Sequence, residues 1–97
     1  MVLLTVVVHP IDTAAHPTVP PGFRWALMLG EGPAGQLDRC ANAAWAPTLA
    51  EARTEGDRNG ASATRVLQML GTPARYGGVQ ELDHDPIPAG ADRIHTA

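Results

Sequence analysis

The sequence predicts a single α+β domain in which one long helix packs on one face of an antiparallel sheet of three to four strands, in the order β-β-β-α-β. Three segments indicate this fold: a β-branched apolar run at residues 2–8, an alternating segment at residues 23–29, and a stretch with helix start and stop signals at residues 48–73. A chain of 97 residues has room for one modest core. We expect residues 1–85 to form the domain and residues 86–97 to form an extended C-terminal tail.

The first segment, VLLTVVV at residues 2–8, is apolar at positions that point to both faces of a strand. This pattern is typical of a strand covered on both sides or of one that lies inside a dimer interface. His9 and Pro10 end the run, and the proline-rich residues 11–22 predict an extended connection.

The next two segments predict a pair of antiparallel strands joined by a glycine-rich loop at residues 30–36. Alternation places one set of large apolar side chains on a common face: Phe23, Trp25, Leu27 and Leu29. In residues 37–46 it predicts one face made of Leu37, Arg39, Ala41, Ala43 and Trp45. The other face of that strand would carry Asp38, Cys40, Asn42, Ala44 and Ala46.

A capping box marks the start of the helix, because the Thr48 hydroxyl can accept from the Glu51 amide while Glu51 reaches back. Gly71 and Pro73 give a C-terminal stop signal. We therefore expect one helix over residues 49–70. The alternative is two helices broken at GDRNG, residues 56–60, because Asn-Gly is a favoured turn dipeptide.

Periodicity favours the continuous helix. A projection at about 100° per residue gathers one stripe: Leu49, Ala52, Gly56, Gly60, Ala63, Val66, Leu67 and Leu70. Both glycines fall in phase with this stripe, where a missing side chain lets the backbone approach the sheet. Trp25 and Trp45 are the side chains expected to fill that space. Beyond the helix, residues 74–78 predict a loop and residues 79–85 predict a last strand. Ile87 and Ile94 are the residues through which the tail could dock on the domain.

Composition narrows the class of function. Hydrophobic residues make up 44% of the chain but aromatic residues only 4%, so an alanine-rich core buries little area and a homodimer is expected. A net charge of −3 disfavours a nucleic-acid binder. Arginine without lysine, beside abundant alanine, glycine and proline, indicates a GC-rich genome. A single cysteine and the lack of a charged, cleavable leader favour a cytoplasmic location with no membrane contact.

The most chemically suggestive cluster is ELDHD at residues 81–85. On a strand, Glu81, Asp83 and Asp85 would share one face and could hold a divalent cation, while His84 would point to the other. The simpler interpretation is a charged edge strand that discourages aggregation, and we therefore expect no metal and no cofactor.

No arrangement typical of an enzyme is present, so catalysis is not expected. The histidines lack ligand spacing: His9, His16, His84 and His95. Cys40 lies within a predicted strand, away from a helix N-terminus that would lower its pKa. Ser62 falls on the outer helix face, outside a G-x-S-x-G context.

An arginine and tryptophan surface is the basis for a nucleic-acid alternative. Arg24, Trp25, Arg39 and Trp45 lie on neighbouring predicted strands, and Arg58 and Arg65 line the outer helix face. The competing interpretation is that the two tryptophans supply aromatic mass to the core.

The strand-to-helix junction CANAAWAPTLAEA, residues 40–52, resembles that of HicB-like antitoxins, through Thr48, Glu51 and Ala52 after a strand near residues 21–29. The resemblance covers about a quarter of the chain and implies a small sheet with a packed helix, a protein partner and frequent dimerisation. Two features depart from the family. Residues 44–47 replace its usual glycine, and the tail is too short for its helical DNA-binding module.

These observations lead us to expect a small non-enzymatic regulatory protein that binds a protein partner or itself, through a sheet edge or the outside of its helix. The alternatives are a nucleic-acid-associated regulator and a metal protein or enzyme centred on residues 81–85.

Overall fold

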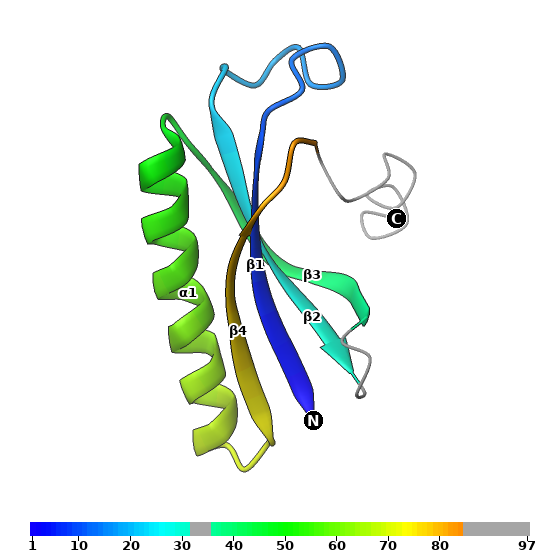
Figure 1. The fold of residues 1–97 in the computed structure, drawn as a ribbon, viewed down its shortest axis with the longest axis vertical. Helices are drawn as coiled ribbons and strands as arrows, with labels where there is room; N and C mark the ends of the chain where they lie inside the picture. The colour runs from blue at the N-terminus through cyan, green and yellow to red at the C-terminus, as the bar shows by residue number, and fades with distance from the viewer. Residues whose placement is uncertain (32–35, 85–97) are drawn as a thin grey trace.

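A computed structural model describes residues 1–31 and 36–84. It contains strands β1 (Val2–Pro10), β2 (Phe23–Glu31) and β3 (Gln36–Ala46), helix α1 (Leu49–Met69) and strand β4 (Ala74–Glu81) (Figure 1). The predicted α+β class and β-β-β-α-β order are confirmed. The predicted tail, residues 86–97, lies outside the described residues, as do the core of the predicted glycine-rich loop and Ile87 and Ile94.

The four strands form one sheet in the order β3-β2-β1-β4. β1 pairs antiparallel with β2 and β2 with β3, but β4 runs parallel to β1, so a fully antiparallel sheet was not the right expectation. The cause is the length of α1. Its 21 residues at about 1.5 Å each run back along the sheet to the end where β1 starts. There the Val2 amide donates to the Pro73 carbonyl over 2.9 Å, and β4 begins.

The position of β1 explains its sequence. Its two hydrogen-bonding edges are both used within the chain, by β2 and β4. Strand pairing of β1 with a second copy, one of the explanations of its apolar run, is therefore excluded. Its two faces are buried as well, with Val6 and Val8 toward α1 and Val7 on the opposite side.

α1 is one uninterrupted helix, as predicted. The Glu51 amide donates to the Thr48 hydroxyl over 3.2 Å at its start, and Leu70 is the C-cap before Gly71 in a left-handed conformation. Gly56 lies against Val6 and Trp25. Close approach to the sheet thus explains a glycine in mid-helix.

Gly60 makes a similar approach, to Val6 and Tyr76. Trp45 fills neither space, contrary to expectation. It lies on the opposite face of the sheet, where its indole Nε1 donates to the Pro20 carbonyl over 3.0 Å.

The inner face of α1 differs from the predicted stripe at both ends. The buried helix positions recur every four residues: Ala52, Gly56, Gly60 and Thr64. A spacing of four exceeds the 3.6-residue turn, so the line of contact winds around the helix as it follows the twisted sheet. Leu49, Val66 and Leu70 were predicted to face the core but are exposed.

Thr64 was not included in the predicted stripe because its hydroxyl group is polar. Its side chain is buried, and its Oγ1 donates to the Gly60 carbonyl one turn earlier over 2.8 Å. The polar group is thereby satisfied inside the helix, and the methyl group contributes to the packed face.

Irregularities in β3 and β4 explain two further differences. Leu27 pairs with Asn42 but Met28 pairs with Cys40, so Ala41 is an extra residue in β3. The predicted alternation of faces therefore holds for the residues after Ala41 but not for those before it. The segment at residues 74–78 was predicted as a loop but belongs to β4. Its glycines form a bulge, in which Gly78 takes a φ of 89°.

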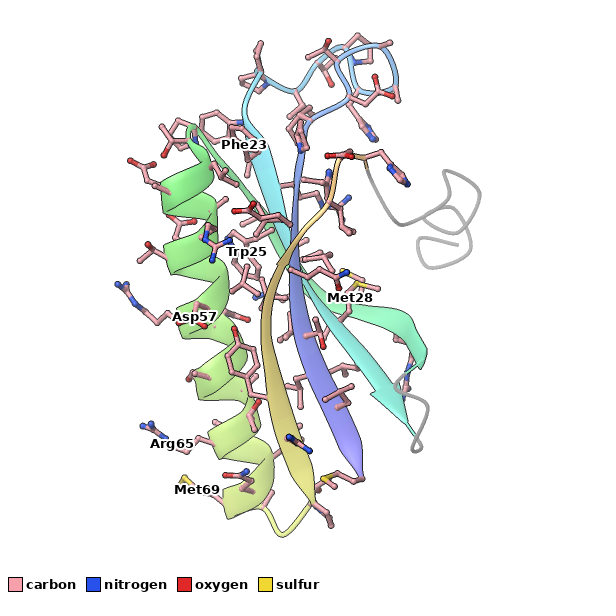
Figure 2. The ribbon with its side chains drawn as sticks, viewed as in Figure 1. Phe23, Trp25, Met28, Asp57, Arg65 and Met69 are labelled. Carbon is pink, nitrogen blue, oxygen red and sulfur yellow. The ribbon has the colours of Figure 1, made fainter. Side chains whose placement is uncertain are left out.

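The sheet has an apolar cluster on each face. The larger one lies between sheet and helix around Leu4, Val6, Val8 and Trp25. The smaller one comprises Val7, Ala26 and Met28 on the opposite face, with Cys40, Ala43 and Leu82 packed against it. Figure 2 shows Trp25 between sheet and helix and Met28 on the other side.

Candidate functional site

Two regions of the described chain have features of a binding site. One is the outer face of α1, defined here by the exposed residues Glu51, Arg58, Ser62, Arg65 and Met69. The other is a cavity at the end of the sheet, beneath the loop that joins β1 to β2.

The C-terminal end of the outer face carries an apolar patch. Val66, Met69 and Leu70 are 52%, 79% and 75% exposed, and their spacing of three and four residues places them side by side. Figure 2 shows Met69 and Arg65 pointing away from the sheet. Large apolar side chains gathered on a surface are typical of a protein interaction site.

Charges along the same face change sign. The acidic Glu51 lies in the first turn, Arg58 lies near the middle and Arg65 lies in the second half, and the last turn contains no basic residue. The outer face of α1 therefore has an acidic end and an end that is basic and apolar.

Other charged side chains of α1 instead tie the helix to the sheet. Arg53 forms an ion pair with Glu81 of β4. The Trp25 indole donates to Glu55 over 3.2 Å, which satisfies the N–H of a ring that is only 5% exposed. These contacts fix the orientation of α1 and thus which side of it faces outward.

The cavity has a volume of about 290 Å³. Its apolar walls are Ile11, Val19, Ala43 and Ala44. The remaining lining residues bear charge or a heteroaromatic ring: His9, Asp12, His16, Arg24 and Trp45.

Pairing of the strands brings three of these residues into one row. His9 of β1 is opposite Arg24 of β2, which is opposite Trp45 of β3. The row lies on the face that α1 does not cover. His9 is almost completely buried, and its Nδ1 lies 2.9 Å from the carbonyl oxygen of Pro10.

The β1–β2 loop is held over this row by its own hydrogen bonds. Asp12 Oδ1 accepts from the amides of Ala14 and Ala15 at 3.0 and 3.3 Å, and the Ile11 amide donates to the Gly22 carbonyl. Trp45 reaches across to the Pro20 carbonyl. The connection between β1 and β2 was predicted to be extended, but it is a loop with internal hydrogen bonds that forms one wall of the cavity.

The structure separates the arginines and tryptophans that were predicted to share a surface. Trp25 is in the core, as the competing interpretation held, but Trp45 is 42% exposed beside Arg24. A platform of two stacked tryptophans is therefore excluded. Arg58 and Arg65 lie on α1, on the other side of the sheet.

The predicted acidic cluster does not form a line of three carboxylates. β4 ends at Glu81, whose carboxylate pairs with Arg53, and Asp83 and His84 follow in a bend. Asp85 lies outside the described residues. Within residues 1–31 and 36–84, no group of three or more His, Cys, Asp or Glu side chains is placed to hold a metal ion.

The other candidate residues are dispersed. Cys40 is half-buried in β3, where its Sγ donates to the Asn42 carbonyl over 3.5 Å, and Ser62 is exposed on α1 as predicted. His84 is exposed, and His95 lies outside the described residues. The meeting of His9 and His16 at one cavity was missed, although His9 lies at the end of β1 and His16 lies in the loop that follows it.

No protein-family model, curated protein or solved structure matches this chain. In the part of the chain that the structure describes, no helix has the length and apolar character needed to cross a membrane.

Proposed function

We propose that this chain is a small non-enzymatic binding protein of a regulatory kind, which self-associates as a homodimer through the outer face of α1. The observation that carries the proposal is the exposed patch of Val66, Met69 and Leu70. Keeping three large apolar side chains in water has a cost of roughly 25 cal/mol per Å², which a partner surface removes.

A second copy is the partner that the helix fits best. A twofold interface brings the same surface of two subunits together in opposite directions. In such an antiparallel pair, Glu51 of one subunit lies toward Arg65 of the other, since the charges of the outer face change sign along α1. The pairing is attractive at both ends.

The experiment is light scattering on the eluting protein, with Met69→Glu as the test variant and Gln80→Glu as the control. Both replacements add one negative charge at an exposed position, but only the first lies in the apolar patch. The wild type and Gln80→Glu should approach twice the chain mass as concentration rises, and Met69→Glu should remain at the chain mass. A monomeric wild type, or a dimeric Met69→Glu, contradicts the proposal.

The pair of Arg24 and Trp45 supports a second candidate, a nucleic-acid-associated regulator that stacks one base on the exposed indole. The net charge of −3 makes it the weaker one. Salt-sensitive binding of a single-stranded oligonucleotide, lost in Trp45→Ala, would favour it over self-association alone.

A further inference from the structure

The geometry points to a binding site for a doubly charged oxyanion of the phosphate class, formed by Arg58 of both copies at the twofold axis of the homodimer. The inference rests on the proposed function, because each copy supplies half of the site. It goes further in naming a ligand, on which the strength of the dimer then depends.

Symmetry brings the two Arg58 side chains together. The charges of the outer face set Glu51 of one copy beside Arg65 of the other. In a twofold antiparallel pair that contact is repeated with the copies exchanged, so the axis lies level with the position midway between residues 51 and 65. That position is residue 58. A twofold pair that joins Glu51 to Arg65 therefore sets Arg58 against its own copy.

Arg58 lies at the middle of the outer face of α1. It is two residues from each of the buried positions Gly56 and Gly60, so a turn of about 100° per residue places it on the opposite side of the helix. Arg58 is exposed, and among residues 1–31 and 36–84 its side chain has no ion pair or hydrogen bond. Thr54 and Ser62, one turn before and after it on the same side, are uncharged. In the described part of its own chain, Arg58 is thus a cation without a bound counter-charge.

The acidic residues nearest to Arg58 in the sequence, Glu55 and Asp57, serve the contact between helix and sheet. Glu55 Oε2 accepts from the Trp25 indole over 3.2 Å, and Asp57 Oδ1 accepts from the Tyr76 hydroxyl over 2.7 Å. Both donors belong to the sheet, so these two carboxylates are directed toward it and away from the axis. The two Arg58 guanidiniums therefore meet without either carboxylate between them.

A pair of guanidiniums at an axis selects a particular kind of anion. The two cations repel each other, and an anion between them replaces that repulsion with two attractions. Each guanidinium presents a planar fork of N–H donors that matches two oxygens of a phosphate group. A tetrahedral oxyanion offers one pair of oxygens to each fork, and its two charges offset both arginines. A carboxylate or a chloride ion brings one charge, so phosphate and sulfate fit the site better.

The test is sedimentation equilibrium, which gives the dissociation constant of the dimer, in inorganic phosphate and in chloride at equal ionic strength. Arg58→Gln removes the proposed ligand of the anion. Arg75→Gln is the matched control, because it removes an exposed arginine from β4. Phosphate also strengthens apolar contacts of proteins in general, so its effect is judged by comparing the variants. Thermal melts establish that the variants are folded.

In the wild type and in Arg75→Gln, millimolar phosphate should lower the dissociation constant of the dimer roughly fivefold or more relative to chloride. In Arg58→Gln the two salts should give the same constant. That variant should also dimerise in chloride at least as tightly as the wild type, because a repulsion at the axis has been removed. A phosphate effect that persists in Arg58→Gln, or a dimeric wild type without one, overturns the inference and leaves the proposed function standing.

A second measurement asks whether the site needs both copies. Calorimetric titration with inorganic phosphate should give one anion per two chains for the wild type and no saturable binding to Met69→Glu, which is expected to be monomeric. Equal binding by Met69→Glu would assign the anion to a single copy and overturn the inference without reference to Arg58→Gln. A wild type that is monomeric in both salts overturns the proposed function and this inference together.

Discussion

The hydroxyl of Tyr76 on β4 donates to Asp57 Oδ1 on α1 over 2.7 Å. This bond joins helix and sheet on the same side as the ion pair of Arg53 with Glu81. The Tyr76 ring also covers Gly60, so one side chain both packs under the helix and ties it to a carboxylate.

The alkaline stability of the fold should depend on Tyr76. Burial first, and then the hydrogen bond to Asp57 and its negative charge, raise the pKa of Tyr76 well above its ordinary value of 10.0. The contribution of protonated Tyr76 to the stability of the folded protein is fully present below pH 10.0. Above it the unfolded chain loses the phenolic proton while the folded chain keeps it, so stability falls as pH rises toward the folded pKa.

Absorbance of tyrosinate measures this directly, because Tyr76 is the one tyrosine in the chain. We expect ionisation to coincide with unfolding in wild type and to shift toward 10 in denaturant. Tyr76→Phe should have a shallower loss of stability above that pH. Ordinary ionisation of Tyr76 in the folded protein contradicts this account.

Gly56→Ala should destabilise the protein despite the better helix propensity of alanine. The new Cβ would lie 2.6 Å from Val6 Cγ1 and 3.1 Å from Trp25 Cβ. Overpacking costs about 1–3 kcal/mol, against about 1 kcal/mol gained from propensity. We expect a net loss of up to about 2 kcal/mol in the free energy of unfolding measured in urea. Ser62→Ala, on the exposed side, is the control and should change stability by less than about 0.5 kcal/mol.

The two glycines of α1 also explain why a single continuous helix could be predicted from the sequence. Gly56 and Gly60 were recognised as in phase with the apolar stripe, and that phase is a property of sequence alone. The side chains opposite them were not predictable in the same way. Trp45 was assigned to the wrong face because strand alternation does not reveal the register between two strands, and in the observed register Trp45 is opposite Arg24 and not Trp25.

The exposed patch at the C-terminal end of α1 was also not predicted, because the line of contact with the sheet winds around the helix. Val66 and Leu70 were predicted to be core residues because an ideal projection keeps one stripe along the whole helix. Sheet twist, which is set by the other strands, turns their side of α1 outward. The end cavity was missed for a different reason. Its residues come from three strands and a loop, and the strand order that joins them was unknown.

Thr48→Ala should weaken the start of α1. The Thr48 hydroxyl accepts from the Glu51 amide, and the helix begins at the next residue. Loss of such a cap costs about 1 kcal/mol. Thr54→Ala is the matched control, because that threonine is exposed in mid-helix, where alanine is the better residue. Among the wild type, Thr48→Ala and Thr54→Ala, we expect Thr48→Ala to have the lowest midpoint of chemical denaturation. Equal midpoints of the three proteins would show that the cap contributes nothing to stability.

The two tryptophans should differ sharply as fluorophores, because they lie on opposite faces of the sheet. Trp25 is 5% exposed and Trp45 is 42% exposed. Acrylamide should therefore quench Trp25→Phe, which retains only the exposed ring, much more than Trp45→Phe, whose emission should also lie at shorter wavelength. Equal quenching of the two variants would mean that β3 presents Trp45 to the core, and the cavity would then lose its aromatic wall.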